Sequence, residues 1–307
     1  MTDRLMLLDT ASLYFRAFYG VPDSVKAPDG RPVNAARGLL DMIAKLVTTY
    51  EPSELIACWD DDWRPQWRVD LIPSYKAHRV VEVVPGAPDV EEVPDPLEAQ
   101  IPLIREELEV LRIPIVGAAQ HEADDVIASL AAQSPIPVDI VTGDRDLFQL
   151  VEDARGVRVI YTGRGMSNLE VLDDSVVTTK YRVLPEQYAD FAVLRGDASD
   201  GLPGVAGIGE KTAATLLQTH GDLTAIRGAA SEAAAPGMTA GVRAKILAAS
   251  DYLDVAPTVV EVVRTLDLPA VDARLRAPDA AQVAALDATW NLGSSLQRAV
   301  SALTARA

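Results

Sequence analysis

Residues 4–9 read Arg-Leu-Met-Leu-Leu-Asp, a short apolar run that ends in an acidic residue. The same order of an apolar run followed by acid recurs at residues 54–60, and residues 138–142 are apolar again before a Gly-Asp pair. Short apolar runs bounded by turn residues are typical of strands buried in a sheet. Residues 113–116 and 157–161 are further runs of this kind. We therefore predict a sheet built from these five segments.

Helical patterns separate the predicted strands. Apolar residues recur at helical spacing between residues 39 and 47 and between residues 101 and 111, and residues 122–131 place Ala123, Ile127 and Leu130 on one face. Strands that alternate with helices favour a parallel sheet with helices on both faces. The predicted fold class is therefore α/β.

After about residue 175 the pattern becomes helical. Pro185 suits the first turn of a helix, residues 213–217 form a compact helix that Gly221 can end, and the Ala-rich stretch 229–249 predicts surface helix and loop. We expect an α/β domain over residues 1–175 and a helical region over residues 176–307.

The segment from Val80 to Ile104 differs from the rest of the α/β domain. It contains no Lys or Arg, carries several acids, and has five prolines that preclude one continuous helix. We expect residues 80–104 to form a long mobile excursion from the α/β domain. Long loops of this kind are often functional. A solvated disordered loop is the alternative that composition supports equally.

Composition restricts the cellular compartment of the protein and argues against nucleic acid as a partner. The net charge of −17 disfavours nucleic acid, unless part of the acid excess binds metal and the rest lies away from the substrate. The single cysteine, Cys58, excludes a disulfide within the chain. No stretch reaches the length needed to span a membrane. We expect a cytoplasmic protein.

Acidic residues follow several of the predicted strands. The carboxyl ends of parallel strands open onto one crevice, which is where ligands bind. The acids at this edge are Asp9, Asp60, Glu122, Asp124, Asp125, Asp144 and Asp146. Singly, each has an ordinary explanation as a helix-start acid or a turn residue. Together they would repel one another unless cations lay between them.

The oxygen-only character of this set selects hard ions. Magnesium or manganese is expected rather than zinc, and His78, His121 and His220 form no zinc pattern. Two such ions about 4 Å apart can activate water and stabilise the leaving oxygen of a phosphodiester. The acids thus predict cleavage of nucleic acid.

A glycine-rich stretch, Gly204-Val205-Ala206-Gly207-Ile208-Gly209-Glu210-Lys211-Thr212, precedes the helix at residues 213–217. It is not an ATP-binding P-loop, because Glu210 separates the last glycine from the lysine and no strand leads into it. Glycines at a helix start still expose backbone N–H groups to a phosphate, and Lys211 adds positive charge. A plain tight turn is the alternative.

The motifs in order resemble one family. They are Asp9-Thr10-Ala11-Ser12-Leu13-Tyr14-Phe15-Arg16, Trp67-Arg68, Tyr75-Lys76-Ala77-His78-Arg79, Glu122-Ala123-Asp124-Asp125, Gly143-Asp144-Arg145-Asp146 and Gly196-Asp197-Ala198-Ser199-Asp200. Over about residues 4–225 the chain resembles the 5' nuclease (flap endonuclease) family, particularly the 5'–3' exonuclease domain of bacterial family A DNA polymerases. The resemblance implies a PIN-like nuclease core, a helix-three-turn-helix at residues 185–225, and no polymerase domain.

The resemblance also implies roles for particular residues. It places Asp9, Asp60, Glu122, Asp124 and Asp125 around one metal and Asp144, Asp146, Asp197 and Asp200 with the other, with Asp124 between them. Arg16, Tyr75, Lys76 and Arg79 resemble the residues that draw the scissile phosphate to the metals; Lys76, Arg79 and Asp124 are the implied catalytic groups. Gly207, Gly209, Lys211 and Thr212 resemble the part that grips duplex DNA. Potassium would be held by backbone carbonyls of Val205 and Ile208.

The implied substrate is DNA with a 5' flap, nick or 5' end, including RNA-primed ends, cut by a monomer in replication and repair. Two departures from the family pattern stand out: the family often has a basic threading arch where residues 82–98 are acidic, and Gly201 replaces the usual asparagine. Two other functions stay open: a DNA-junction-binding protein without catalysis, and a PIN-type ribonuclease. Cleavage of flap DNA compared with single-stranded RNA separates the three.

Overall fold

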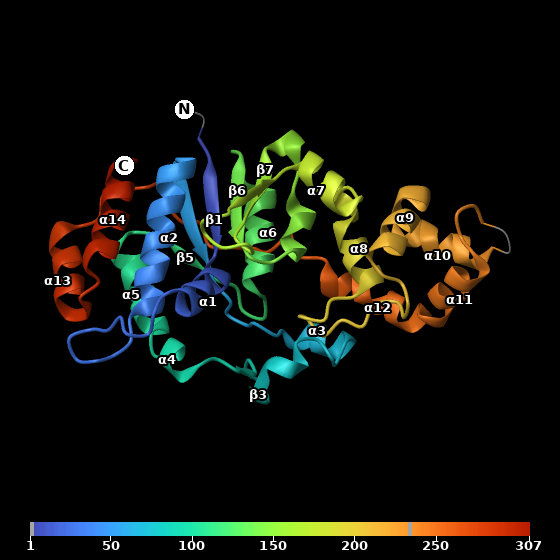
Figure 1. Ribbon diagram of the computed structural model, residues 1–307, viewed down its shortest axis with the longest axis horizontal. Coiled ribbons are helices and arrows are strands. Elements are labelled where there is room, and N and C mark those ends of the chain that lie inside the picture. The colour runs from blue at the N-terminus through green and yellow to red at the C-terminus, as the bar shows by residue number, and fades with distance from the viewer. Residues whose placement is uncertain (1–2, 233–234) are drawn as a thin grey trace.

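A six-stranded sheet forms the centre of the molecule, in the order β5-β2-β1-β6-β7-β8 (Figure 1). This computed structural model describes residues 3–232 and 235–307. The pairings from β5 to β7 are parallel, and β8 joins the edge antiparallel. The predicted parallel sheet is confirmed, and β8 is an addition to it. The strands are β1 (Leu5–Asp9), β2 (Glu54–Cys58), β5 (Ile115–Val116), β6 (Val138–Thr142), β7 (Val157–Tyr161) and β8 (Glu170–Leu172).

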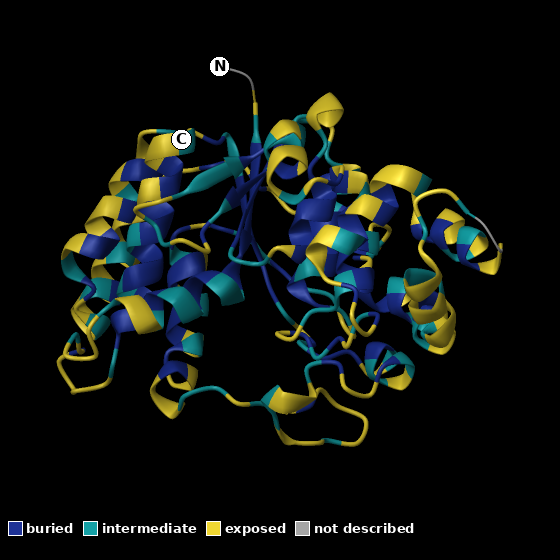
Figure 2. Ribbon diagram, turned by 45° about the vertical axis from the view of Figure 1, so that its right-hand side comes forward, coloured by how far each residue is buried: buried dark blue, intermediate teal, exposed yellow. Residues whose placement is uncertain are grey.

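The central strands are buried on both faces, which explains their continuous apolar sequence (Figure 2). Successive side chains of β1 enter different cores: Leu5 and Leu7 join one cluster, and Met6 and Leu8 join the other. Asp139 of β6 is a polar residue in the middle of a buried strand. It is fully buried and pairs with Arg4 and Arg158.

Helices cover both faces of the sheet, as the alternating pattern predicts. One core lies beneath α1 and α2, and the other beneath α6. The helices of the α/β part are α1 (Thr10–Gly20), α2 (Asn34–Tyr50), α3 (Gln66–Leu71), α4 (Asp95–Glu98), α5 (Ile101–Val110), α6 (Ala123–Gln133) and α7 (Asp174–Tyr181), with 3-10 turns η1 (Ala77–Arg79), η2 (Asp146–Leu150) and η3 (Asp153–Arg155).

A helical region occupies the far end of the molecule, on the right of Figure 1. Its elements are η4 (Pro185–Gln187), α8 (Tyr188–Arg195), α9 (Glu210–His220), α10 (Leu223–Ser231), α11 (Ala240–Ala248) and α12 (Ser250–Val260). Gly221 ends α9 as expected, and its N–H donates to the Leu217 carbonyl. In the Ala-rich stretch, residues 233–234 lie outside the described residues, and α10 and α11 flank them.

The last part of the chain returns to the α/β core, so residues 176–307 do not form one helical region as expected. Beyond α12, the Leu55 N–H of β2 donates to the Ala273 carbonyl and the Leu275 N–H donates to the Ser53 carbonyl. The helix α14 (Gly293–Thr304) then packs beside α2, and α13 (Ala280–Trp290) contacts α5 and α14 (Figure 1). The general helical pattern expected after about residue 175 does not indicate where these helices pack, because an apolar face does not specify which face it covers.

The excursion at residues 80–104 has regular structure. The strands β3 (Val80–Glu82) and β4 (Val90–Glu91) form an antiparallel hairpin, and the short α4 follows. Two buried polar side chains anchor it: Asp89 pairs with Arg64, and the Gln100 amide oxygen accepts from the Ala35 N–H at 2.8 Å. The prolines do preclude one continuous helix. The expected excursion thus forms a docked hairpin and not the disordered loop that was the alternative, and its mobility stays a prediction.

Among the described residues, no helix is both long enough and apolar enough to cross a membrane.

The contact between α14 and α2 gives a test of the C-terminal return. We expect Leu296→Ala to lower the free energy of unfolding by about 2–4 kcal/mol, because Leu296 is 1% exposed and its loss leaves a cavity in the core. Chemical denaturation measures the change. The exposed Gln282→Ala on α13 is the matched control. Equal stability of the two variants would contradict the packing described.

Candidate metal centre and active site

Three strand ends place carboxylates at one edge of the sheet. Asp9 ends β1 and also caps α1, accepting from the Ser12 N–H at 3.2 Å and from the Thr142 hydroxyl at 2.6 Å. Asp60 follows β2 and accepts from the Ala123 N–H of α6 at 2.7 Å. Asp144 follows β6. The backbone of neighbouring elements therefore holds these acids in place.

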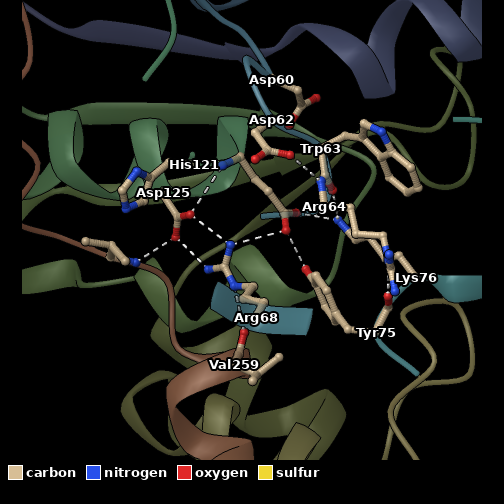
Figure 3. Close-up of polar contacts among 12 residues, drawn as sticks. Asp60, Asp62, Trp63, Arg64, Arg68, Tyr75, Lys76, His121, Asp125 and Val259 are labelled. Atoms are coloured by element: carbon tan, nitrogen blue, oxygen red, sulfur yellow. Dashed lines mark hydrogen bonds and ion pairs between the residues drawn. The ribbon is translucent and has the colours of Figure 1, made fainter. Parts of the chain in front are cut away.

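The N-terminus of α6 supplies the next acids. Glu122 caps the helix, and its side chain and that of Asp125 form a reciprocal capping box. Asp125 is fully buried, and both its oxygens accept from Arg68, at 2.7 and 2.8 Å (Figure 3). One oxygen also accepts from the Val263 N–H. The Asp125 carboxylate is thus fully engaged by the protein.

Glu122 faces three counter-groups. One oxygen accepts from Arg68 at 3.2 Å and from the Tyr75 hydroxyl at 2.7 Å. The other oxygen pairs with the Lys76 ammonium. Burial opposes the charge on Lys76, yet Glu122 and neighbouring acids raise the pKa of Lys76 well above its usual value. Lys76 is therefore a permanent cation at the acidic edge.

These residues surround a pocket of about 220 Å³. Its acids come from strand ends, from α6 and from the hairpin, and two cations and two aromatic residues complete its wall. The lining includes Asp9, Asp60, Glu91, Glu122, Asp124, Asp144, Lys76, Arg79, Phe15 and Trp63. A second, smaller hollow shares Glu122 and Asp124 and adds Asp146 and Asp200. Asp124 thus lines both hollows, and its position between two metals stays a prediction from the family resemblance.

Burial and mutual repulsion make these acids unusual. Burial raises the pKa of Asp9 to about 7, with Asp60 and Asp144 adding repulsion. Burial also raises the pKa of Asp60, and with Asp144 and Asp9 it raises that of Asp124 well above the usual range. The Asp124 side chain makes no hydrogen bond or ion pair with any other described residue. In the absence of cations, burial and repulsion therefore favour the protonated form of these acids, and a bound cation would favour their charged form.

The second group of acids has the same character. Asp146 is buried with one carboxylate oxygen unpartnered among the described residues, and burial raises its pKa, with Asp144 and Asp200 adding repulsion. Burial raises the pKa of Asp200 to about 6, although Arg79 donates to it at 3.1 Å. Asp197 pairs with Arg195 and lines neither hollow. The negative charge of Asp197 also raises the pKa of Asp146.

Comparison with known proteins decides the family. A family model described as "5'-3' exonuclease, N-terminal resolvase-like domain" matches residues 4–182, and one described as "5'-3' exonuclease, C-terminal SAM fold" matches residues 183–281. The chain belongs to the 5'-3' exonuclease family. It is accordingly a 5' nuclease, a hydrolase of phosphodiester bonds.

Several proteins are similar in sequence to this 5' nuclease. A protein named 5'-3' exonuclease from Streptomyces coelicolor is 57% identical over 302 residues, covering 98% of this chain and 100% of that protein. A 5'-3' exonuclease of Mycobacterium tuberculosis is 48% identical, covering 99% and 98%. The DNA polymerase I of Mycobacterium bovis is 39% identical over 250 residues, which is 78% of this chain but 26% of the polymerase.

Solved structures share the fold at low sequence identity. A structure described as divalent metal ions (zinc) bound to T5 5'-exonuclease matches with a TM-score of 0.65 at 18% identity, covering 98% of both chains. The catalytic core of Rad2 in complex with DNA substrate matches with a TM-score of 0.59 at 17% identity, covering 98% of this chain and 91% of that one. The 5' nuclease therefore shares its fold with a protein solved with bound zinc and with a protein solved in complex with DNA.

The four residues expected to contact substrate lie in three different places. Lys76 and Arg79 line the acidic pocket, as expected. Tyr75 is 4% exposed, packs in the hydrophobic core and lines the second hollow, and its stacking on a base stays a prediction. Arg16 lines a neighbouring hollow of about 910 Å³ that shares Ser12 and Phe15 with the acidic pocket. Phe15 and Trp63 are the aromatic side chains that line the acidic pocket itself.

Sequence reasoning missed further pocket or support residues, among them Phe15, Trp63, Arg68 and Glu91. Phe15 and Arg68 lie within the quoted motifs, so their position was visible but their contacts were not. Glu91 lies in the excursion, outside every motif, and only the docking of the hairpin brings it to the pocket. No sequence signal identifies it, because the chain path between residues 80 and 104 depends on tertiary contacts.

The helix-three-turn-helix segment joins α8 to α9 through a compact turn. Gly196 and Gly204 both have positive φ, and a Cβ on Gly204 would lie 2.4 Å from the Gly196 nitrogen. Val205 and Ile208 are buried, and the Val205 carbonyl accepts from the Ile208 N–H. Lys211 is exposed at the start of α9, and Gly209 caps that helix. The Lys245 ammonium donates to the Gly207 carbonyl at 2.9 Å.

The residues fit divalent metal ions by their chemistry. Among residues 3–232 and 235–307, no three potential ligands already converge on one metal position. Yet the pocket contains carboxylate oxygens without protein partners, an orphaned oxygen on Asp146, and acids whose repulsion cations would relieve. Oxygen donors of this kind select hard divalent ions. The donor set therefore fits a divalent metal requirement, which agrees with the metal ions in the related T5 structures.

Gly201 stands where the family usually has an asparagine, and the structure shows what glycine allows at this position. Its φ is +69°, and a Cβ there would lie 2.1 Å from the Ser74 carbonyl oxygen. The Ser74 hydroxyl donates to the Gly201 carbonyl at 2.8 Å, and the Lys76 N–H donates to the Asp200 carbonyl at 2.9 Å. Glycine thus allows the segment that carries Lys76 to approach the turn that carries Asp200.

The raised carboxyl pKa values predict how metal and pH affect stability. Between pH 3.8 and about 7, the folded chain holds a proton on Asp9 that the unfolded chain has released. The metal-free protein should therefore lose stability as pH rises through this window. Magnesium or manganese should raise Tm more at about pH 7.5 than at about pH 5, because protons compete with the ions.

Differential scanning fluorimetry with and without chelator measures this effect. Matched ionic strength without divalent ions is the control, since general screening then stays constant. A Tm that does not change with divalent ions at either pH value would contradict the proposed metal centre.

The contact at Gly201 predicts a second result. Gly201→Ala should lower stability by about 1–3 kcal/mol through backbone strain and should reduce cleavage, because the segment bearing Lys76 must move. Gly228→Ala in α10 is the matched control, since a Cβ there meets nothing within 4 Å. Denaturation and cleavage rates measure both effects. Unchanged stability and cleavage in Gly201→Ala would show that the approach is not needed.

Proposed function

We propose that this 5' nuclease hydrolyses DNA at 5' flaps and 5' ends with two magnesium or manganese ions. The observation that carries the proposal is the pair of adjoining acidic hollows that share Glu122 and Asp124, beside Lys76 and Arg79. Oxygen-only acids disfavour zinc as the working ion. We propose Asp9, Asp60, Glu122, Asp124, Asp144, Asp146 and Asp200 as the groups that hold the ions. Asp197 would support them from beside the second hollow.

Asp125 has a different proposed role. Its two oxygens are occupied by Arg68 and the Val263 N–H, so we infer that it positions Arg68 rather than coordinating an ion directly. Arg68 in turn holds Glu122. This chain of contacts fixes the start of α6, where Asp124 projects into the pocket.

The residues of the chain bind and orient the scissile phosphate. Bound divalent ions would supply the Lewis acidity for attack of water on the phosphodiester. Lys76 and Arg79 are positively charged groups in the pocket wall, suited to holding the phosphate and to stabilising its growing charge. Glu122 and Asp200 hold these two cations before the substrate enters. Attack by water should leave a 5'-phosphate on the product.

The helical region is the proposed contact for duplex DNA. Gly207, Gly209, Lys211 and Thr212 lie in the turn and first turn of α9, where backbone N–H groups and a lysine suit a phosphate. Potassium bound by the Val205 and Ile208 carbonyls stays a prediction. We expect the protein to act as a monomer in the cytoplasm, in removal of primers, including RNA-primed ends, and in repair.

Substitution of the central acids tests the proposed chemistry. Asp124→Asn and Asp146→Asn should each reduce cleavage of 5'-flap DNA by about two orders of magnitude or more, because each removes a charged oxygen from the acidic hollows. Folding should survive, since burial of a neutral amide relieves repulsion. Cleavage of labelled DNA with mapped products, and Tm, measure the two effects.

The exposed Asp251→Asn in α12 is the matched control. Full activity of Asp124→Asn or Asp146→Asn would refute the centre. Absence of cleavage by the unaltered protein with either ion would instead indicate a DNA-binding protein, and preference for single-stranded RNA would indicate a ribonuclease.

A further inference from the structure

The β3–β4 hairpin is held against the active-site pocket by a buried ion pair. Asp89 and Arg64 lie 2.5 Å apart, and each side chain is 6% exposed. The second Asp89 oxygen accepts from the Val84 N–H, and the Asp89 carbonyl accepts from the Trp63 indole. Arg64 also donates to the Tyr75 and Pro73 carbonyls. The same arginine thus ties the hairpin to the segment that carries Lys76.

This docking brings one acid of the hairpin into the pocket. Glu91 in β4 pairs with Val80, and it lines the acidic pocket with Lys76 and Arg79. The next residue, Glu92, donates its N–H to the Arg79 carbonyl at 2.7 Å but does not line that pocket. The backbone of the hairpin therefore fixes Glu91 beside the two cations.

The Glu91 carboxylate is a surplus charge there. It makes no hydrogen bond or ion pair with any other described residue, whereas Lys76 already pairs with Glu122 and Arg79 already pairs with Asp200. Asp60 and Glu122 repel Glu91, and Arg79 and Lys76 attract it. Phosphate entering the pocket beside these cations meets an additional negative charge. No Lys or Arg between residues 80 and 104 offsets it.

We propose that Glu91 is a specificity-determining residue that disfavours substrates with a long 5' single strand. The inference rests on the proposed 5' nuclease function and adds which 5' structures the site prefers. In this proposal the unpaired 5' strand reaches the pocket past Glu91, so phosphates beyond the scissile one that come within about a Debye length of Glu91 are repelled. A 5' end with one unpaired nucleotide avoids most of this repulsion. The ion pair of Asp89 and Arg64 keeps the charge in place.

The experiment compares two substrates with the same duplex: one with a single unpaired 5' nucleotide and one with a long single-stranded 5' flap. The variant is Glu91→Gln, which keeps size and removes charge. Glu92→Gln is the matched control, since it removes the same charge from the adjacent residue outside the pocket. Two quantities are measured for each protein: kcat/KM with magnesium, and the Kd for both DNAs with calcium as a non-catalytic ion.

We expect Glu91→Gln to raise kcat/KM for the long flap by about 5-fold relative to the single-nucleotide substrate, as one partly screened charge allows. Its Kd for the long flap should fall by a similar factor, and the difference should shrink at high salt. Glu92→Gln should match the unaltered protein in both ratios. A side chain that only supports the hairpin would change both substrates equally.

Two results would overturn the inference. An unchanged flap preference in Glu91→Gln would show that the charge does not select the substrate. An equal loss of cleavage on both DNAs would show that Glu91 assists catalysis itself. Absence of cleavage by the unaltered protein would count against the proposed function alone, because the calcium affinities still test the role of Glu91.

Discussion

Repulsion among buried carboxylates at the carboxyl edge of the sheet is the constraint on which the rest of the structure depends. Parallel strands deliver acids to one edge, and burial there raises the pKa of Asp9, Asp124 and Asp146. A protein that converges such charges must offset them with cations or lose stability. The arrangement around the pocket is largely a response to this requirement.

The chain offsets part of the charge with its own cations. Arg68 binds Asp125 and Glu122, Lys76 binds Glu122, and Arg79 binds Asp200. These pairs lie at the border of the two hollows, whereas Asp124 and one oxygen of Asp146 stay without protein partners among the described residues. The protein thus pairs some of these acids with its own cations and leaves Asp124 and one oxygen of Asp146 unpaired, which fits a divalent metal requirement.

The same cations link distant parts of the chain. Arg68 of α3 donates to the Val259 carbonyl at the end of α12, and Asp125 accepts from the Val263 N–H. Arg64 joins the excursion to the segment before Lys76. Assembly of the site and docking of the helical region therefore share residues. A buried charge network of this kind specifies one arrangement, because each broken contact would leave a charge unpaired.

The sequence by itself determined the alternation of strands and helices, the parallel sheet, and the convergence of acids from Asp9 to Asp146. These follow from local periodicity and from the geometry common to parallel sheets. The tertiary structure alone decided that Tyr75 is buried, that Asp125 is consumed by Arg68, that α14 returns to α2, and that the hairpin places Glu91 at the pocket. These depend on contacts between residues far apart in the chain, which no local pattern encodes.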